Sequence, residues 1–95
     1  MDAEEFVREH ANKASSGRIA EVMADLTPES MQQAMAALAG GPNPVTGNSV
    51  KPAGQEGDDH LFDVTYTGDG GASVSIRDRV RQVDGKWKIT QISKL

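Results

Sequence analysis

The chain has 95 residues, a formal net charge of −4 and no cysteine. This length corresponds to one domain, residues 1–95, with a modest core, because a chain of this size buries roughly 60–65% of its unfolded surface. The lack of cysteine excludes disulfides and thiolate metal sites, and two histidines without paired metal spacing argue against zinc. The acidic balance argues against nucleic-acid binding.

Membrane and cofactor motifs are missing from the sequence. No apolar run approaches the roughly 20 residues that a membrane helix needs, so we expect no membrane association. The chain carries no signal peptide, so as it stands it predicts a cytoplasmic protein, and an exported one if an upstream leader has been removed. It holds no phosphate loop, nucleophile elbow, zinc helix or calcium loop, so we expect no cofactor and no metal.

The first part of the chain predicts three helices. Asp2 can cap a helix over residues 2–16, in which apolar residues recur at helical spacing. A second, short helix spans residues 18–26. Thr27 and Pro28 cap and start a third helix, whose expected apolar stripe is Met31, Ala34, Met35 and Leu38.

Two strands of unequal strength follow. Residues 45–57 hold three glycines, one proline and few apolar residues, so they predict only a weak leading strand. Pro52 confines this strand to the edge of the sheet, because it has no amide hydrogen to donate. Residues 60–67 predict a clearer strand, with Phe62, Val64 and Tyr66 on one face.

The strongest local signal is a β-hairpin over residues 71–95. Asp84-Gly85 lies between two alternating runs, and both residue types tolerate the positive φ of a type I′ turn. Counting outward places Asp78 opposite Gln91, and the period of two puts on the inner face Val74, Ile76, Asp78, Val80, Gln82, Trp87, Ile89, Gln91 and Leu95. The outer, basic face takes Arg77, Arg79, Arg81, Lys86, Lys88, Thr90, Ile92 and Lys94. A one-residue bulge would exchange the two sets beyond it.

Two stretches together carry a family resemblance. One is the end of the first helix at Gly17, followed by Arg-Ile-Ala-Glu-Val-Met-Ala-Asp-Leu-Thr-Pro-Glu at 18–29, and the other is Asp-Gly-Lys-Trp-Lys-Ile at 84–89. The chain resembles the nuclear transport factor 2-like superfamily, which includes SnoaL-like proteins and ketosteroid isomerases. The resemblance implies an α+β cone, in which N-terminal helices pack on a curved antiparallel sheet of about four strands. It also implies a pocket at the open end and a homodimer.

Asp78 is the main catalytic candidate. It is expected on the inner face between Ile76 and Val80, where apolar neighbours raise the pKa of a carboxyl and suit it to proton transfer. The alternative is a structural Asp78 that is hydrogen-bonded to Gln91 or an arginine, because buried charges are usually paired.

His60 is the second catalytic candidate, with a solvent-exposed strand start as the alternative. The predicted ligand-binding set combines a few polar groups with apolar walls: Phe62, Tyr66, Asp78, Trp87 and Gln91. His10, on the first helix, is expected to be a satisfied or half-exposed histidine rather than a ligand.

The stripe Arg77, Arg79 and Arg81 predicts either a partner surface or a solvated sheet face that Asp63 partly balances. No aromatic residue interrupts it, which argues against single-stranded nucleic acid.

Three functions remain open. The first is a non-catalytic ligand-binding or accessory domain that holds a small apolar ligand and forms a homodimer. The second is an isomerase- or dehydratase-like enzyme, with Asp78 as general base and His60 or Tyr66 as its partner. The third is an adaptor that acts through the arginine stripe. We rank them in this order, because the chain is short and has no catalytic motif.

Overall fold

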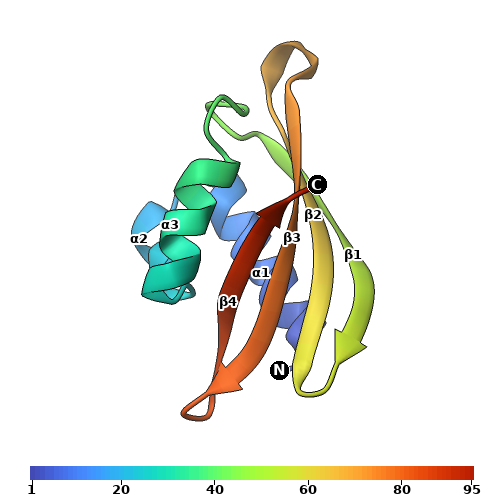
Figure 1. The fold of residues 1–95 in the computed structure, drawn as a ribbon. Helices are drawn as coiled ribbons and strands as arrows, with labels where there is room; N and C mark the ends of the chain where they lie inside the picture. The colour runs from blue at the N-terminus through green and yellow to red at the C-terminus, as the bar shows by residue number, and fades with distance from the viewer.

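Three helices cover one face of a curved, open antiparallel sheet (Figure 1). A computed structural model describes residues 1–95. The helices are α1 (Ala3–Ser15), α2 (Ile19–Ala24) and α3 (Pro28–Ala37). The strands, paired in chain order, are β1 (Gly47–Glu56), β2 (Asp59–Thr67), β3 (Ser73–Val83) and β4 (Lys86–Lys94). The expected α+β fold, with N-terminal helices followed by about four strands, is confirmed.

The two longer helices begin at the predicted caps. The Asp2 side chain accepts a hydrogen bond from the amide of Glu5 at 2.8 Å. At the start of α3, Thr27 and Ser30 form a reciprocal capping box ahead of Pro28. These contacts satisfy amide hydrogens that have no partner inside the helix.

The side of α3 that meets the sheet differs from the expected stripe. Ser30 donates its hydroxyl to the carbonyl of Ile89 at 2.7 Å, and Gln33 accepts the amide of Ile92 at 2.7 Å. These contacts satisfy polar groups on the outer edge of β4, which the sheet itself leaves unpaired. They turn the opposite side of α3 outward, so Met35 is 73% exposed and its expected inward position is wrong.

β1 is a full edge strand rather than a weak remnant. Nine of its 10 residues pair with β2, and the register shifts between Pro52 and Gly54, where Ala53 has no partner. The expected edge position of Pro52 is confirmed. Val50 is the one buried residue of this strand, so its sequence shows almost no apolar alternation.

The hairpin of β3 and β4 forms around the predicted turn. Asp84 and Gly85 have φ values of 53° and 80°, as a type I′ turn requires. Next to the turn, Gln82 pairs with Trp87, as predicted. On the other side of β3, Asp78 pairs with Phe62, which places Asp78 on the inner face.

A one-residue bulge at Thr90 changes the second half of β4. The register shifts between Arg79 and Val80, and the Thr90 hydroxyl donates to the carbonyl of Arg79 at 3.3 Å. Asp78 therefore pairs with Ile92 instead of Gln91. Because side chains alternate, the extra residue exchanges the two faces beyond it.

Three residues that were expected on the inner face are exposed: Gln82, Gln91 and Leu95. Gln91 is exposed and Ile92 is buried, the reverse of the expectation, because both follow the bulge. Leu95 is 59% exposed at the end of the chain. Gln82 is exposed near the hairpin tip, although it pairs as predicted.

The core forms where α1 crosses the inner face of the sheet. Phe6, Val7 and Ala11 of α1 belong to one buried cluster with β-strand residues that include Val64, Ile76, Val80 and Ile89. Trp87 is partly buried and packs against this cluster, whereas the arginines of β3 lie on the other face. None of the helices combines the length and the apolar character that crossing a membrane requires.

Candidate functional site

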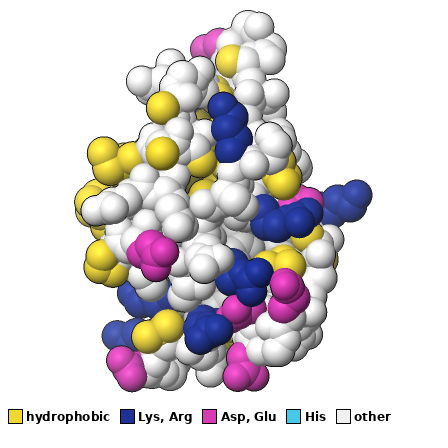
Figure 2. Space-filling model, in the orientation of Figure 1, with side chains coloured by type: hydrophobic (Ala, Val, Ile, Leu, Met, Phe, Trp, Pro, Cys, Tyr) yellow, Lys and Arg dark blue, Asp and Glu magenta, His cyan; other side chains and the backbone are white.

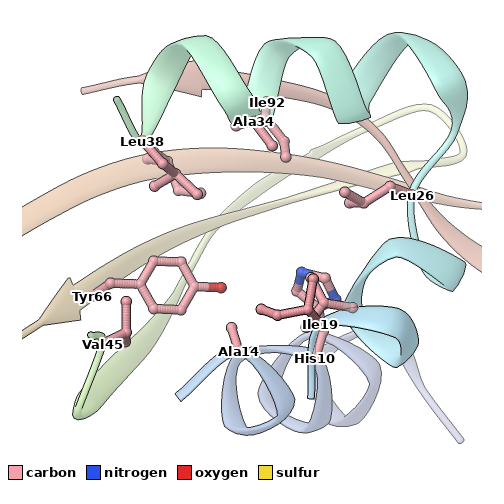
Figure 3. Close-up of a pocket in the computed structure, with 11 residues that line it drawn as sticks. His10, Ala14, Ile19, Leu26, Ala34, Leu38, Val45, Tyr66 and Ile92 are labelled. Atoms are coloured by element: carbon pink, nitrogen blue, oxygen red, sulfur yellow. The ribbon is translucent and has the colours of Figure 1, made fainter. Parts of the chain in front are cut away.

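A cavity of about 160 Å³ lies between the helices and the inner face of the sheet (Figure 3). Of its 11 lining residues, 10 are hydrophobic. All three helices, the loop before β1 and strands β2 to β4 contribute to the wall. Ile19 and Leu38 line the cavity although they are 57% and 37% exposed, so they mark its opening to solvent.

Two polar groups belong to this apolar wall, His10 of α1 and Tyr66 of β2. The Tyr66 hydroxyl points into the space between the helices and the sheet, toward the side where His10 lies (Figure 3). Burial, with a smaller effect of the nearby Asp78 carboxyl, raises the pKa of Tyr66 above its ordinary value. The hydroxyl therefore keeps its hydrogen and can donate it to a bound molecule.

His10 is held by the carboxylate of Asp25, which follows α2. The His10 Nδ1 lies 2.9 Å from Asp25 Oδ2, and the Lys13 ammonium donates to the same oxygen at 3.2 Å. Burial raises the pKa of the Asp25 carboxyl, but the hydrogen bonds from His10 and Lys13 outweigh it and leave the pKa below its ordinary value. Asp25 is therefore the ionised acceptor of this group.

Asp78 lies on the inner face of β3, opposite Phe62, and is not part of the cavity wall. It is completely buried, and neither of its carboxylate oxygens has a hydrogen-bond partner. Burial raises the pKa of Asp78 to about 7, and its interaction with His10 opposes this only in part. Asp78 is a carboxyl of the kind that exchanges a proton near neutral pH, although its side chain does not line the cavity.

The other predicted inner-face residues lie apart from this cavity. His60 is the second residue of β2, six positions before Tyr66, which corresponds to about 20 Å along the strand. Its ring meets the edge of Trp87 at a centroid distance of 5.6 Å, and Trp87 donates to the carbonyl of Met1. Phe62 is buried in the core. The structure therefore brings His60 together with Trp87, away from the cavity that Tyr66 lines.

The arginine stripe is paired within the chain. Arg77 contacts Asp63 through two hydrogen bonds, at 2.7 and 3.1 Å. Arg79 and Arg81 share the carboxylate of Asp59, and Arg79 also reaches Glu56. Figure 2 shows basic and acidic side chains interleaved across this face. Gln91, which the bulge turns outward, lies beside Arg77 and Arg79 in a polar hollow of about 240 Å³.

His10 and Asp25 are the site residues that the sequence did not reveal. They are fifteen positions apart, on different helices, and no local motif joins them. One signal was available: His10 falls on the apolar face of α1, between Val7 and Ala11, where an imidazole needs a buried partner. No cluster of three or more histidine, cysteine, aspartate or glutamate side chains has the arrangement of a metal site.

Comparisons of the chain with protein-family models, with curated proteins and with solved structures found no match. The geometry of the cavity is therefore the basis for its proposed function.

Proposed function

We propose that this protein is a small-ligand-binding domain whose ligand occupies the cavity between the helices and the sheet. The observation that carries the proposal is an apolar cavity of about 160 Å³ with two polar groups, His10 and Tyr66, in its wall. Ligand sites usually combine an apolar lining with a few polar groups that orient the ligand. We also propose, from the order of its elements and the two matching stretches, that the chain is a short member of the nuclear transport factor 2-like superfamily.

The volume limits the size of the ligand. An apolar protein cavity of roughly 150 Å³ accommodates benzene. A cavity of about 160 Å³ therefore suits a molecule with a single ring or a short branched chain. Ile19 and Leu38 are exposed members of the wall, so such a molecule can reach the cavity from solvent.

Filling the cavity tests the proposal. Ala34 lines the cavity from α3, whereas Ala36 of the same helix is exposed. With toluene as the probe, we expect saturable binding to the wild type, little binding to Ala34→Leu and unchanged binding to Ala36→Leu. Chemical-shift titration measures all three. Equal binding by the two variants would place the toluene elsewhere and reject the proposal.

A proton-transferring enzyme of the isomerase or dehydratase kind is the second candidate. Asp78 favours it, because a buried carboxyl with no partner and a pKa of about 7 suits a general base. Since Asp78 does not line the cavity, this candidate also requires a movement that opens the carboxyl to the substrate. A single-ring β,γ-unsaturated ketone is a suitable probe, since moving one proton along its carbon chain gives an absorbing conjugated product. This candidate predicts that the wild type accelerates the shift and that Asp78→Asn does not. Equal rates with and without protein would end it.

We retain the homodimer as part of the proposal, and sedimentation equilibrium tests it directly. The arginine stripe is a weaker candidate for the contact than the sequence suggested, because Arg77, Arg79 and Arg81 already pair with acids of their own chain. Charge reversal at Arg81, the most exposed of the three, should leave the oligomeric state unchanged. Dissociation of a dimer by this change would restore the stripe as a partner surface.

A further inference from the structure

We infer that the cavity takes a small single-ring ligand with a hydroxyl group, which donates its hydrogen to His10 Nε2 and accepts one from the Tyr66 hydroxyl. The inference rests on the proposed ligand-binding function and adds the chemical class of the ligand. Its basis is the pair of polar atoms that the fold leaves facing the apolar cavity.

The contact with Asp25 determines what His10 can do. An ionised carboxylate only accepts hydrogen bonds, so Nδ1 of His10 must carry the hydrogen that Asp25 Oδ2 accepts at 2.9 Å. In a neutral imidazole the other nitrogen, Nε2, is then an acceptor. Asp25 is thus a positioning residue, which holds the ring in one tautomer and orientation.

Neither polar atom is used by the fold. His10 Nε2 and the Tyr66 hydroxyl make no hydrogen bond within the protein, although both side chains belong to buried residues. The only side-chain polar atoms that are both fully buried and without a hydrogen-bond partner are the two carboxylate oxygens of Asp78. The unpaired atoms of His10 and Tyr66 are not among them, so these atoms border open space. The free atoms of His10 and Tyr66 therefore open into the cavity that both residues line (Figure 3).

The two atoms select a hydroxyl among common functional groups. A hydroxyl donates and accepts at one oxygen, and so it matches an acceptor, Nε2, and a donor, the Tyr66 hydroxyl. A ketone or ether accepts only and leaves Nε2 unpaired. A carboxylate or ammonium group would lose its hydration against a wall of 10 hydrophobic residues. Together with the volume of the cavity, these limits describe a phenol or a small cyclic alcohol.

Phenol and toluene form a matched pair of probes, because the hydroxyl of one takes the place of the methyl group of the other. Toluene leaves water more readily, so a cavity without a suitable polar partner prefers toluene. We expect the wild type instead to bind phenol roughly tenfold more tightly than toluene, as one well-made hydrogen bond allows. Titrations followed by methyl chemical shifts measure both affinities.

Two variants assign the preference to the named atoms. Tyr66→Phe removes a hydroxyl that makes no hydrogen bond in the fold, and we expect it to weaken the binding of phenol several-fold and leave the binding of toluene unchanged. In Asp25→Asn the His10 ring should no longer be held in the tautomer with its hydrogen on Nδ1, and the preference for phenol should fall. ¹⁵N spectra of the His10 ring report the tautomer directly. Lys13→Gln is the control, because Lys13 contacts the same Asp25 oxygen but not His10.

The outcomes separate this inference from the proposed function. Saturable toluene binding with no preference for phenol would overturn the hydroxyl ligand and leave the binding cavity in place. Binding of neither probe would reject both. A hydrogen on Nε2 in the wild-type ¹⁵N spectrum, with Nδ1 bare, would also overturn the inference, because His10 would then be a donor.

Discussion

His10 of α1 and Asp25 after α2 meet through a contact of 2.9 Å, with side chains only 5% and 14% exposed. The contact joins the first helix to the segment that leads into α3. From that segment, the Asp25 carbonyl accepts the amide of Ile89 at 2.9 Å, and so the same residue also reaches β4. The orientation of the imidazole is therefore coupled to the packing of the helices on the sheet.

Removing the acceptor should destabilise the fold. Asp25→Ala leaves the buried Nδ1 of His10 without a partner, and an unpaired buried donor costs about 1–3 kcal/mol. We expect a loss of this size in the free energy of unfolding, measured by urea denaturation. Lys13→Ala should cost less, since its ammonium can return to solvent. Equal losses in the two variants would contradict a specific role for the histidine contact.

Asp78 should make stability fall as the pH rises toward neutrality. Its pKa is about 7 in the folded chain and about 4 in an unfolded one, so between these values the folded chain binds a proton that the unfolded chain has released. The stabilisation is complete below about pH 4 and is lost by about pH 7. A shift of about three pKa units corresponds to about 4 kcal/mol.

Urea denaturation of the wild type and Asp78→Asn at pH 5 and pH 8 measures this effect. Asparagine does not titrate, so the variant should gain stability relative to the wild type between the two pH values. Asp69→Asn, at an exposed position, is the matched control and should track the wild type. A constant difference between Asp78→Asn and the wild type would show that Asp78 does not titrate in this interval.

Asp59 should make the stability of the fold rise with pH, over a more acidic range than Asp78. Hydrogen bonds from Arg81 and Arg79 lower the pKa of Asp59 to about 2, so its stabilisation is present above about pH 4 and lost as the pH falls through 2. Asp59→Asn should therefore lower the urea midpoint at pH 7 more than Asp58→Asn, since Asp58 makes no ion pair. Identical midpoints would mean that the paired arginines contribute no stability.

Ser30 should be the most sensitive polar residue of α3. It is completely buried, and its hydroxyl joins the Thr27 cap to the Ile89 carbonyl. Ser30→Ala leaves that carbonyl and the cap without this partner, which should cost about 1–3 kcal/mol in the free energy of unfolding. Thermal and urea unfolding measure it, with the exposed Gln32→Ala as control. A Ser30→Ala protein as stable as the control would show that α3 does not depend on this contact.

Local signals in the sequence predicted most of the fold. The caps at Asp2 and Thr27 and the turn at Asp84-Gly85 depend on a few neighbouring residues, and all three formed as expected. The full length of β1 could not be predicted from such local signals. Its one buried residue is Val50, and its length comes from backbone pairing with β2, which side-chain patterns do not record.

The bulge in β4 is the reason that the predicted positions of Gln91 and Ile92 were wrong. After Ile89 the next apolar residue is Ile92, three positions on, which already breaks the period of two. That break was the available signal for an extra residue at Thr90 and for an outward Gln91. The inward position of Asp78 was predicted correctly, because it depends on pairing with β2 and not on β4. The pairing of His10 with Asp25 depends on how two helices pack, which no local pattern specifies.

The central claim is that the space between the helices and the sheet binds a small ligand, and methyl chemical shifts during a phenol titration test it most directly. Ile76 and Ile92 line the cavity, whereas Ile89 is buried outside it. We predict saturable shifts at the first two residues and a much smaller change at Ile89. Shifts confined to exposed apolar residues such as Met35, or shifts that rise linearly without saturation, would contradict the account.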